Sequence, residues 1–186
     1  MEQDGGVLSP LTHHAMKNIL SSIITFAALT LNAADRKIPN PLIDYQGFQK
    51  GAAEVAKLRE QRRVSEEEFL RMAAEPGSII YDARSDSMFA RLHVKGARHL
   101  SLPDVTAEEL AKIIPDKTAR ILIYCNNNFL NQPGAFPAKC ISASLNIYTF
   151  NTLHSYGYDN VYELGPLIDY GKTKLPFEGS TVPASK

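Results

Sequence analysis

The sequence contains little cysteine and no excess of charge of either sign. Two Cys occur among its 186 residues, and 20 Lys and Arg balance 20 Asp and Glu. Two cysteines are too few for a disulfide-stapled scaffold or a four-cysteine zinc site. A chain with zero net charge has no overall field to attract nucleic acid or an anionic membrane, so we expect neither as a partner. With 44% hydrophobic and 22% charged residues, the composition also excludes a disordered, collagen-like or coiled-coil chain.

One uncharged stretch, residues 19–31, lies near the N-terminus just after a lysine. A basic residue, a short apolar run and small residues are the pattern of a secretory signal peptide, and the run is too short for a comfortable bilayer span. We therefore expect residues 16–34 to be a signal peptide that is cleaved after Ala33 or Ala34. The mature chain would be periplasmic or secreted, without a stable membrane span, and residues 1–15 would be an upstream extension. A buried helix in a cytosolic protein is the alternative.

Beyond this stretch, segments with helical spacing alternate with short apolar runs that are typical of buried strands. This alternation predicts an α/β fold, with a parallel sheet covered by helices on both faces. An N-terminal helical extension over residues 35–63 is expected to precede it, and a loose polar tail over residues 173–186 to follow. Helices are expected over residues 45–62 and 138–156. Two further helices are expected to begin at capping boxes, one at Ser65 and one at Thr106. The expected strands are 78–82, 97–100, 120–125 and 161–164.

Cys125 lies at the end of the clearest predicted strand and is followed by three asparagines. In a parallel sheet, ligands bind beyond the carboxyl ends of the strands. Asparagine tolerates left-handed backbone, and a loop curled in that way can aim successive main-chain N–H groups at an anion. That anion could be the thiolate of Cys125, which would make the side chain nucleophilic. A buried, inert cysteine is the alternative.

Four segments of the chain resemble those of rhodanese-like domains, in the family's order. They are residues 81–85 (the Asp-x-Arg signature), 93–97 (the His-Ile-Pro-Gly-Ala segment), 122–125 (the active-site strand and cysteine) and 157–164 (the Gly-Tyr-x-x-Val-Tyr-x-Leu segment). The resemblance implies a rhodanese-like sheet and domain over residues 64–172. It also implies a sulfurtransferase whose Cys125 carries a persulfide, without a metal or an organic cofactor.

The resemblance further implies a set of site residues. Cys125 would take sulfur from a small donor such as thiosulfate and pass it to a thiol or to cyanide. The main chain of the following loop would cradle the persulfide; its residues are Asn126, Asn127, Asn128, Phe129 and Leu130. Asp82, Arg84 and His93 are possible supporting residues, for which a purely structural role is at least as good an interpretation.

Two departures from the family pattern bear on function. The loop after Cys125 has neither the glycine nor the arginine that family loops often contain, so it offers no fixed guanidinium to an anionic donor. The position six residues after Cys125 is Asn131, which argues against a cysteine phosphatase because that chemistry needs a bidentate cation there. Residues 131–137 resemble an insertion, which could form a lid or a surface for a protein partner.

Two other functions stay open at this point. The first is a non-catalytic rhodanese-like binding module of the periplasm, in which Cys125 is idle. The second is a thiol redox protein in which Cys140, fifteen residues further along, forms a disulfide with Cys125. For Cys140 we favour simple core packing on a helix, with Ile141 and Leu145 as neighbours.

Overall fold

The structure is a computed structural model that describes residue 38 and residues 40–182. Its contacts divide the chain into two units, Met1–Asp44 and Tyr45–Lys186. The first unit contributes a turn at residues 41–42 to the described part, and the second holds the helices and strands given below. The predicted upstream extension and signal peptide lie outside the described residues.

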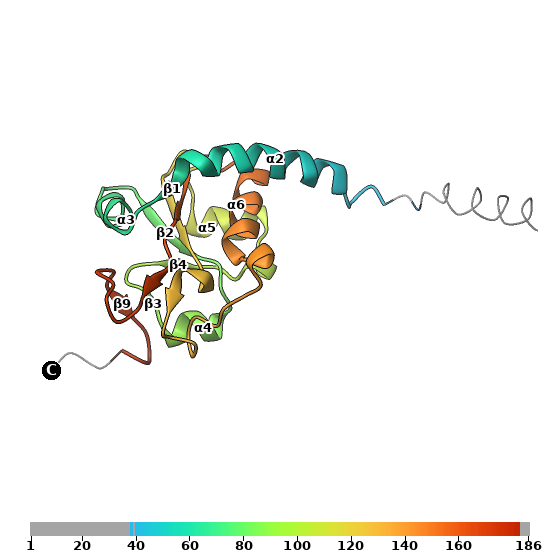
Figure 1. The fold of residues 1–186 in the computed structure, drawn as a ribbon. Coiled ribbons are helices and arrows are strands. Elements are labelled where there is room, and N and C mark those ends of the chain that lie inside the picture. Colours follow the sequence, from blue (N-terminus) through green and yellow to red (C-terminus); the bar gives the residue numbers. More distant parts are fainter. Residues whose placement is uncertain (1–37, 39, 183–186) are drawn as a thin grey trace, which may run out of the picture. The chain divides into compact units, whose positions relative to one another are not determined.

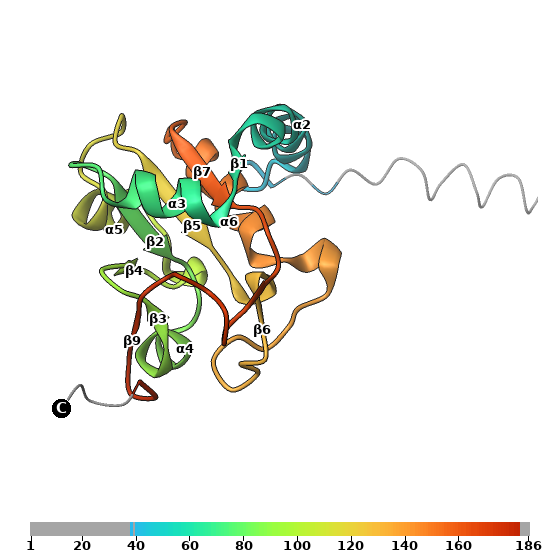
Figure 2. The ribbon, with the colours of Figure 1, turned by 60° about the vertical axis from the view of Figure 1, so that its left-hand side comes forward.

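A five-stranded parallel sheet forms the centre of the second unit (Figure 1), with the strand order β1-β7-β5-β2-β4, whose strands are labelled in Figure 2. The central strand β5 is buried at every residue, as its unbroken apolar run predicts for a parallel strand covered on both faces. This sheet confirms the expected α/β fold. The strands are β1 (Arg63–Val64), β2 (Ile79–Asp82), β4 (Arg98–His99), β5 (Ile121–Tyr124) and β7 (Val161–Leu164).

Helices cover both faces of this sheet (Figures 1 and 2). On one face, a core joins Val55, Leu110 and Phe150 of three helices to alternate residues of β5. On the other face, a second core joins Phe69 to the intervening residues of β5. The first face is covered by α2 (Tyr45–Arg62), α5 (Ala107–Ile113) and α6 (Leu145–Ser155), the second by α3 (Glu66–Ala73), and α4 (Asp86–Arg91) follows β2.

Both predicted capping boxes begin helices where the sequence indicates. The Ser65 hydroxyl accepts a hydrogen bond from the main chain of Glu68 at the start of α3. The Thr106 hydroxyl does the same for Glu109 at the start of α5. Each cap satisfies a main-chain N–H that the first helical turn leaves without a partner.

The helix expected over residues 138–156 is wrong in its first part. The α-helix begins only at Leu145, after a short 3-10 turn η3 (Ile141–Ala143). Upstream of it, the Asn127 amide both accepts from the Lys139 N–H and donates to the Lys139 carbonyl. That pair holds the main chain extended beside the cysteine loop. Cys140 is exposed as a result, so its expected core packing is wrong too.

The expected loose tail is also wrong as far as the described residues reach. Leu175 is buried, because it and Phe177 complete the apolar core on the α3 face. Two short strand pairs close this side of the unit, with β3 and β9 beside α4 (Figure 2). They are β3 (His93–Val94) with β9 (Phe177–Glu178), which are antiparallel, and β6 (Phe129–Leu130) with β8 (Ile168–Asp169), which are parallel. Among the described helices, none is both long and apolar enough to cross a membrane.

Candidate functional site

The alternation of side chains along the strands separates the predicted site residues onto two faces of the sheet. Ile121 and Ile123 face the core under α2, α5 and α6, and Cys125 continues this alternation. Tyr124 faces the opposite core, under α3, and its hydroxyl donates to the carboxylate of Asp82. Cys125 and Asp82 therefore belong to different faces, although both stand at the carboxyl edge of the sheet.

On its face, Cys125 lines a cavity of about 270 Å³. The residue is only 1% exposed, and its Sγ lies 3.5 Å from the Ser144 Oγ just before α6. The other polar residues of the wall are Arg59, Arg63, Asn127, Asn128, Asn146 and Glu163.

Asn128 fixes the loop that follows the cysteine. Its Oδ1 accepts from the Cys125 N–H at 2.8 Å, and its Nδ2 donates to the Leu164 and Pro166 carbonyls at 2.8 and 3.2 Å. These bonds tie the end of β5 to the end of β7. The side chain is buried, so losing any of the three bonds would leave a polar atom without a partner in the interior.

The five loop residues expected to cradle a persulfide do not act as one ring. Asn126, Asn127 and Asn128 form a 3-10 turn, η2, and not the expected left-handed loop. In this turn, the Asn128 N–H donates to the Cys125 carbonyl and the Phe129 N–H donates to the Asn126 carbonyl. Phe129 and Leu130 continue into β6, away from the cavity.

Two of the loop asparagines, Asn127 and Asn128, line the Cys125 cavity. Asn126 lines a different cavity of about 500 Å³, together with Met88 and Leu145. The Asn126 and Asn127 N–H groups are the ones that a 3-10 turn leaves without an internal acceptor. Left-handed backbone occurs further on, at Asn131, where φ is 63°.

A partly buried ion pair stands on the wall of the same cavity. The Glu163 side chain is 6% exposed and makes two hydrogen bonds with Arg59, at 2.7 and 2.9 Å. This pairing raises the pKa of Arg59 against the effect of its burial, and the nearby Cys125 adds a smaller contribution in the same direction. A carboxylate at this depth needs such a partner, because an unpaired buried charge is very costly.

A second guanidinium reaches the same carboxylate from the edge strand β1. Arg63 pairs in register with Glu163, its Nε lies 3.8 Å from the Glu163 carboxylate, and its Nη2 donates to the Gly165 carbonyl at 3.0 Å. Two cations therefore share one carboxylate, which leaves one surplus positive charge on the wall of the Cys125 cavity.

The sequence reasoning missed Arg59, Arg63 and Glu163. One signal was present: Glu163 follows the same alternation as Val161, whose side chain is fully buried, so an inward-facing carboxylate needed a cation. Nothing in the sequence points to which cation, since Arg59 lies 104 residues away.

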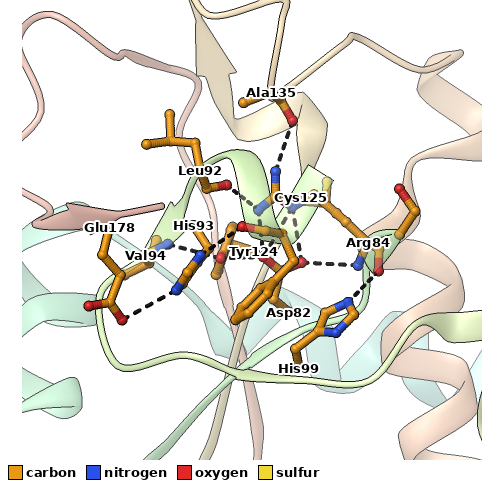
Figure 3. Close-up of polar contacts among 12 residues, drawn as sticks. Asp82, Arg84, Leu92, His93, Val94, His99, Tyr124, Cys125, Ala135 and Glu178 are labelled. Carbon is orange, nitrogen blue, oxygen red and sulfur yellow. Dashed lines mark hydrogen bonds and ion pairs between the residues drawn. The ribbon is translucent and has the colours of Figure 1, made fainter. Parts of the chain in front are cut away.

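Asp82 and Arg84 form a separate network on the α3 face (Figure 3). Their side chains are 0% and 1% exposed, and they share hydrogen bonds of 2.6 to 3.1 Å. Arg84 also donates to the Leu92 and Ala135 carbonyls, and its guanidinium lies 4.2 Å from the centre of the Phe136 ring. The pair thus anchors the loop of residues 131–137 to the end of β2.

Burial and the charge of Asp82 set the ionisation of this network. Desolvation works to lower the pKa of Arg84, but its bonds to Asp82 outweigh that effect and raise it. Burial, aided by the Asp82 charge, raises the pKa of Tyr124 well above its usual value. Tyr124 therefore stays a neutral hydroxyl that donates to Asp82 and accepts from the Val94 N–H.

His93 has a structural environment as well. One ring nitrogen lies 2.8 Å from the Phe89 carbonyl and the other lies 3.3 Å from the Glu178 carboxylate (Figure 3). The ring stacks on that of Phe89 with centres 3.7 Å apart. Neither His93 nor Asp82 nor Arg84 lines the Cys125 cavity.

The two cysteines are both free thiols. Cys140 is held next to the loop by the Lys139 bonds to Asn127, and the Ser142 hydroxyl lowers its pKa. Within the described residues, no group of three or more His, Cys, Asp or Glu could hold a metal ion.

Comparisons with known proteins identify the domain type. The family model described as a rhodanese-like domain matches residues 65–165, which is more than half of the chain. No curated protein matches the chain. Arg59 and Arg63, which stand on the wall of the Cys125 cavity, lie outside the matched residues.

Several solved structures are similar. The Alr3790 protein from Anabaena sp. is 21% identical, over 64% of this chain and 94% of that one, with a TM-score of 0.45. The BH2092 protein from Bacillus halodurans is 15% identical, over 74% of this chain and 91% of that one, with a TM-score of 0.48. A rhodanese with anions from E. coli is 23% identical, over 55% of this chain and 99% of that one, with a TM-score of 0.35.

Proposed function

Because the chain belongs to the rhodanese-like domain family, we propose that it is a sulfurtransferase that passes a sulfane sulfur through a persulfide on Cys125. The observation that carries this proposal is the position of the Cys125 Sγ. It ends the central strand and faces a polar cavity that contains two guanidinium groups. An inert structural cysteine would need neither the cavity nor the cations.

The reaction takes place in two steps whose atoms and electrons balance. The Cys125 thiolate attacks the outer sulfur of the donor, and a new S–S bond forms as the donor's S–S bond breaks. Both electrons of the broken bond leave with the remainder of the donor, which is sulfite when the donor is thiosulfate. A thiolate or cyanide then attacks the outer sulfur of the persulfide, and Cys125 is released as a thiolate.

The surroundings of Cys125 suit a sulfur that is negatively charged during this cycle. The surplus charge of Arg59 and Arg63 over Glu163 can balance a thiolate or a persulfide anion. The Ser144 hydroxyl lies at 3.5 Å from the sulfur and can turn its proton toward it. The small cavity favours donors of a few heavy atoms over large ones.

Two single substitutions test the proposal. Cys125→Ser is expected to reduce sulfur transfer to the uncatalysed background, because serine cannot form a persulfide, while the far-UV circular dichroism and melting temperature stay close to those of the parent. Cys140→Ser is the matched control and should keep full activity. Activity is measured as thiocyanate formed from thiosulfate and cyanide, and with a thiol as acceptor.

The outcome separates the open functions. Full activity in Cys125→Ser would contradict the assignment of the nucleophile. A folded parent protein that transfers no sulfur from any donor would favour the binding module, and loss of activity in Cys140→Ser would favour the thiol redox protein.

A further inference from the structure

We propose that Arg63, supported by Arg59, forms an anion-binding wall of the Cys125 cavity and selects sulfur donors whose leaving group is an oxyanion. This inference rests on the proposed sulfur transfer and adds the residues that set the preference among donors. The loop after Cys125 lacks a cation, and in this proposal α2 and β1 supply it. Both elements lie outside the matched family residues.

The fold explains why Arg63 reaches the cavity. β1 is the edge strand beside β7, and Arg63 stands level with Glu163 in the parallel register. The next contact along this edge is between the Gly165 N–H and the Val64 carbonyl, at 2.9 Å. A Cβ on Gly165 would lie 3.2 Å from that carbonyl. The glycine therefore allows the close approach that brings β1, and Arg63 with it, to the carboxyl end of β5.

The two arginines are not equally available to a ligand. Arg59 makes a two-pronged contact with Glu163 and its side chain is 24% exposed. Arg63 touches the same carboxylate only at 3.8 Å, and its side chain is 52% exposed. Glu163 is thus neutralised chiefly by Arg59, which leaves the charge of Arg63 for an anion entering the cavity.

A separate feature of the cavity is a buried polar atom that lacks a partner. Asn146 is 2% exposed, and its Oδ1 has no hydrogen-bond partner within the described chain. The orientation of this amide follows from its neighbour: Asn128 Oδ1 already accepts from the Cys125 N–H, so the Asn146 atom that faces it at 3.2 Å is the donating Nδ2.

The Oδ1 of Asn146 therefore needs a donor from outside the chain, because buried polar atoms are almost always hydrogen-bonded. Water, or an N–H or O–H group of a bound molecule, can supply it. The cavity then offers a cation on the side of α2 and β1, and a hydrogen-bond acceptor on the side of α6. This arrangement suits a donor whose oxyanion end lies at Arg63 while its sulfur is transferred to Cys125.

Charge selectivity can be measured without any sulfur transfer. In full-length protein carrying Cys140→Ser, the second-order rate constants for alkylation of Cys125 are compared for iodoacetate, an anion, and iodoacetamide, a neutral reagent of similar size. Arg63→Gln should lower the ratio of the iodoacetate to the iodoacetamide rate about tenfold, as expected for the loss of one charge-assisted contact. Arg63→Lys keeps the charge and should restore most of the ratio.

Arg62→Gln is the matched control, because it removes the same charge one residue away. Arg62 lies over the Tyr162 ring and donates to the Asp159 carbonyl, and it does not line the cavity. Its ratio should equal that of the parent. An Arg63→Gln ratio equal to the parent's, or an equal fall of both rate constants, would overturn the anion-binding wall.

A second readout keeps this inference apart from the proposed function. Sulfur loading of Cys125 is followed in the same proteins with two donors. Thiosulfate leaves a persulfide on Cys125 and releases sulfite, whereas a neutral organic trisulfide leaves a mixed disulfide or trisulfide on Cys125 and releases an organic persulfide or thiolate. Arg63→Gln should slow loading by thiosulfate about tenfold more than loading by the trisulfide. If Cys125 of the parent protein takes up sulfur from neither donor, the proposed sulfur transfer is wrong. The ratio of the two alkylation rates still tests whether Arg63 forms an anion-binding wall.

Discussion

At the scale of single residues, the two buried ion pairs have different effects on the molecule. Asp82 and Arg84 are almost wholly enclosed and hold a loop and two strand ends together. Arg59 and Glu163 are also paired at depth, but they stand on the wall of a cavity. The first pair therefore stabilises the fold, whereas the second pair shapes the electrostatics of the candidate site.

Breaking the first pair should be costly. Arg84→Met leaves the Asp82 carboxylate buried without a cation, and we expect a loss of about 3–5 kcal/mol in the free energy of unfolding. Arg71→Met is the control, since Arg71 pairs with Glu68 and Glu75 at the surface, where solvent screening leaves an ion pair with little effect on stability. Urea unfolding measures both. Similar losses in the two variants would show that the Asp82 and Arg84 pair is not the anchor described here.

The sequence allowed the proposed nucleophile to be located but not its surroundings. Cys125 follows from one rule, that ligands bind beyond the carboxyl ends of parallel strands. The loop asparagines were singled out because asparagine tolerates left-handed backbone. In the structure, however, it is their side chains that fix the loop, since Asn128 and Asn127 each bind main-chain groups distant in sequence. Arg63 and Asn146 acquire their roles only through packing, which no local pattern encodes.

At the scale of elements, helices and strands with strong local signals were predictable. The capping residues Ser65 and Thr106 mark true helix starts, and the apolar runs of β2, β5 and β7 mark true strands. Of the two-residue strands, only β4 was expected, within residues 97–100. The other two-residue strands (β1, β3, β6, β8 and β9) were not predictable, because so short a segment has no periodicity. β9 forms because Phe177 packs against Phe129, Phe136 and Tyr170, which is a tertiary effect.

The helix α2 is the element on which both stability and the candidate site depend. Val55 is its buried residue and belongs to the core with Phe150 and Leu153. Val55→Ala removes two methyl groups from this contact and should cost about 2 kcal/mol in the free energy of unfolding. Lys57→Ala, at an exposed position of the same helix, should cost less than about 0.5 kcal/mol. Thermal and urea unfolding measure the difference, and equal effects would mean that α2 is not docked through Val55.

At the scale of the whole molecule, the candidate site combines parts from within and outside the matched family residues. Cys125, Asn146 and Glu163 lie inside residues 65–165, whereas Arg59 and Arg63 precede them. The distance in sequence between these parts explains why family resemblance led to Cys125, the proposed nucleophile, but not to the cations. The charge balance of the chain as a whole is zero, so the surplus positive charge at Cys125 is a local property of the fold.

Export is a further proposal at this scale, and it rests on the uncharged run over residues 19–31. When the full chain is made in cells with a secretory pathway, the mature protein should begin at Ala34 or Asp35. N-terminal sequencing of the recovered protein measures this directly. Protein that keeps residues 19–31 at its N-terminus would contradict the signal peptide.

The central claim is that Cys125 carries the transferred sulfur. The most direct measurement is peptide mass spectrometry of the Cys140→Ser protein after brief exposure to thiosulfate, with the thiols trapped by alkylation. We predict one added sulfur atom on the peptide that contains Cys125, which disappears when cyanide is added and thiocyanate forms. A Cys125 peptide that gains no sulfur, while thiocyanate is still produced at the enzymatic rate, would contradict the account.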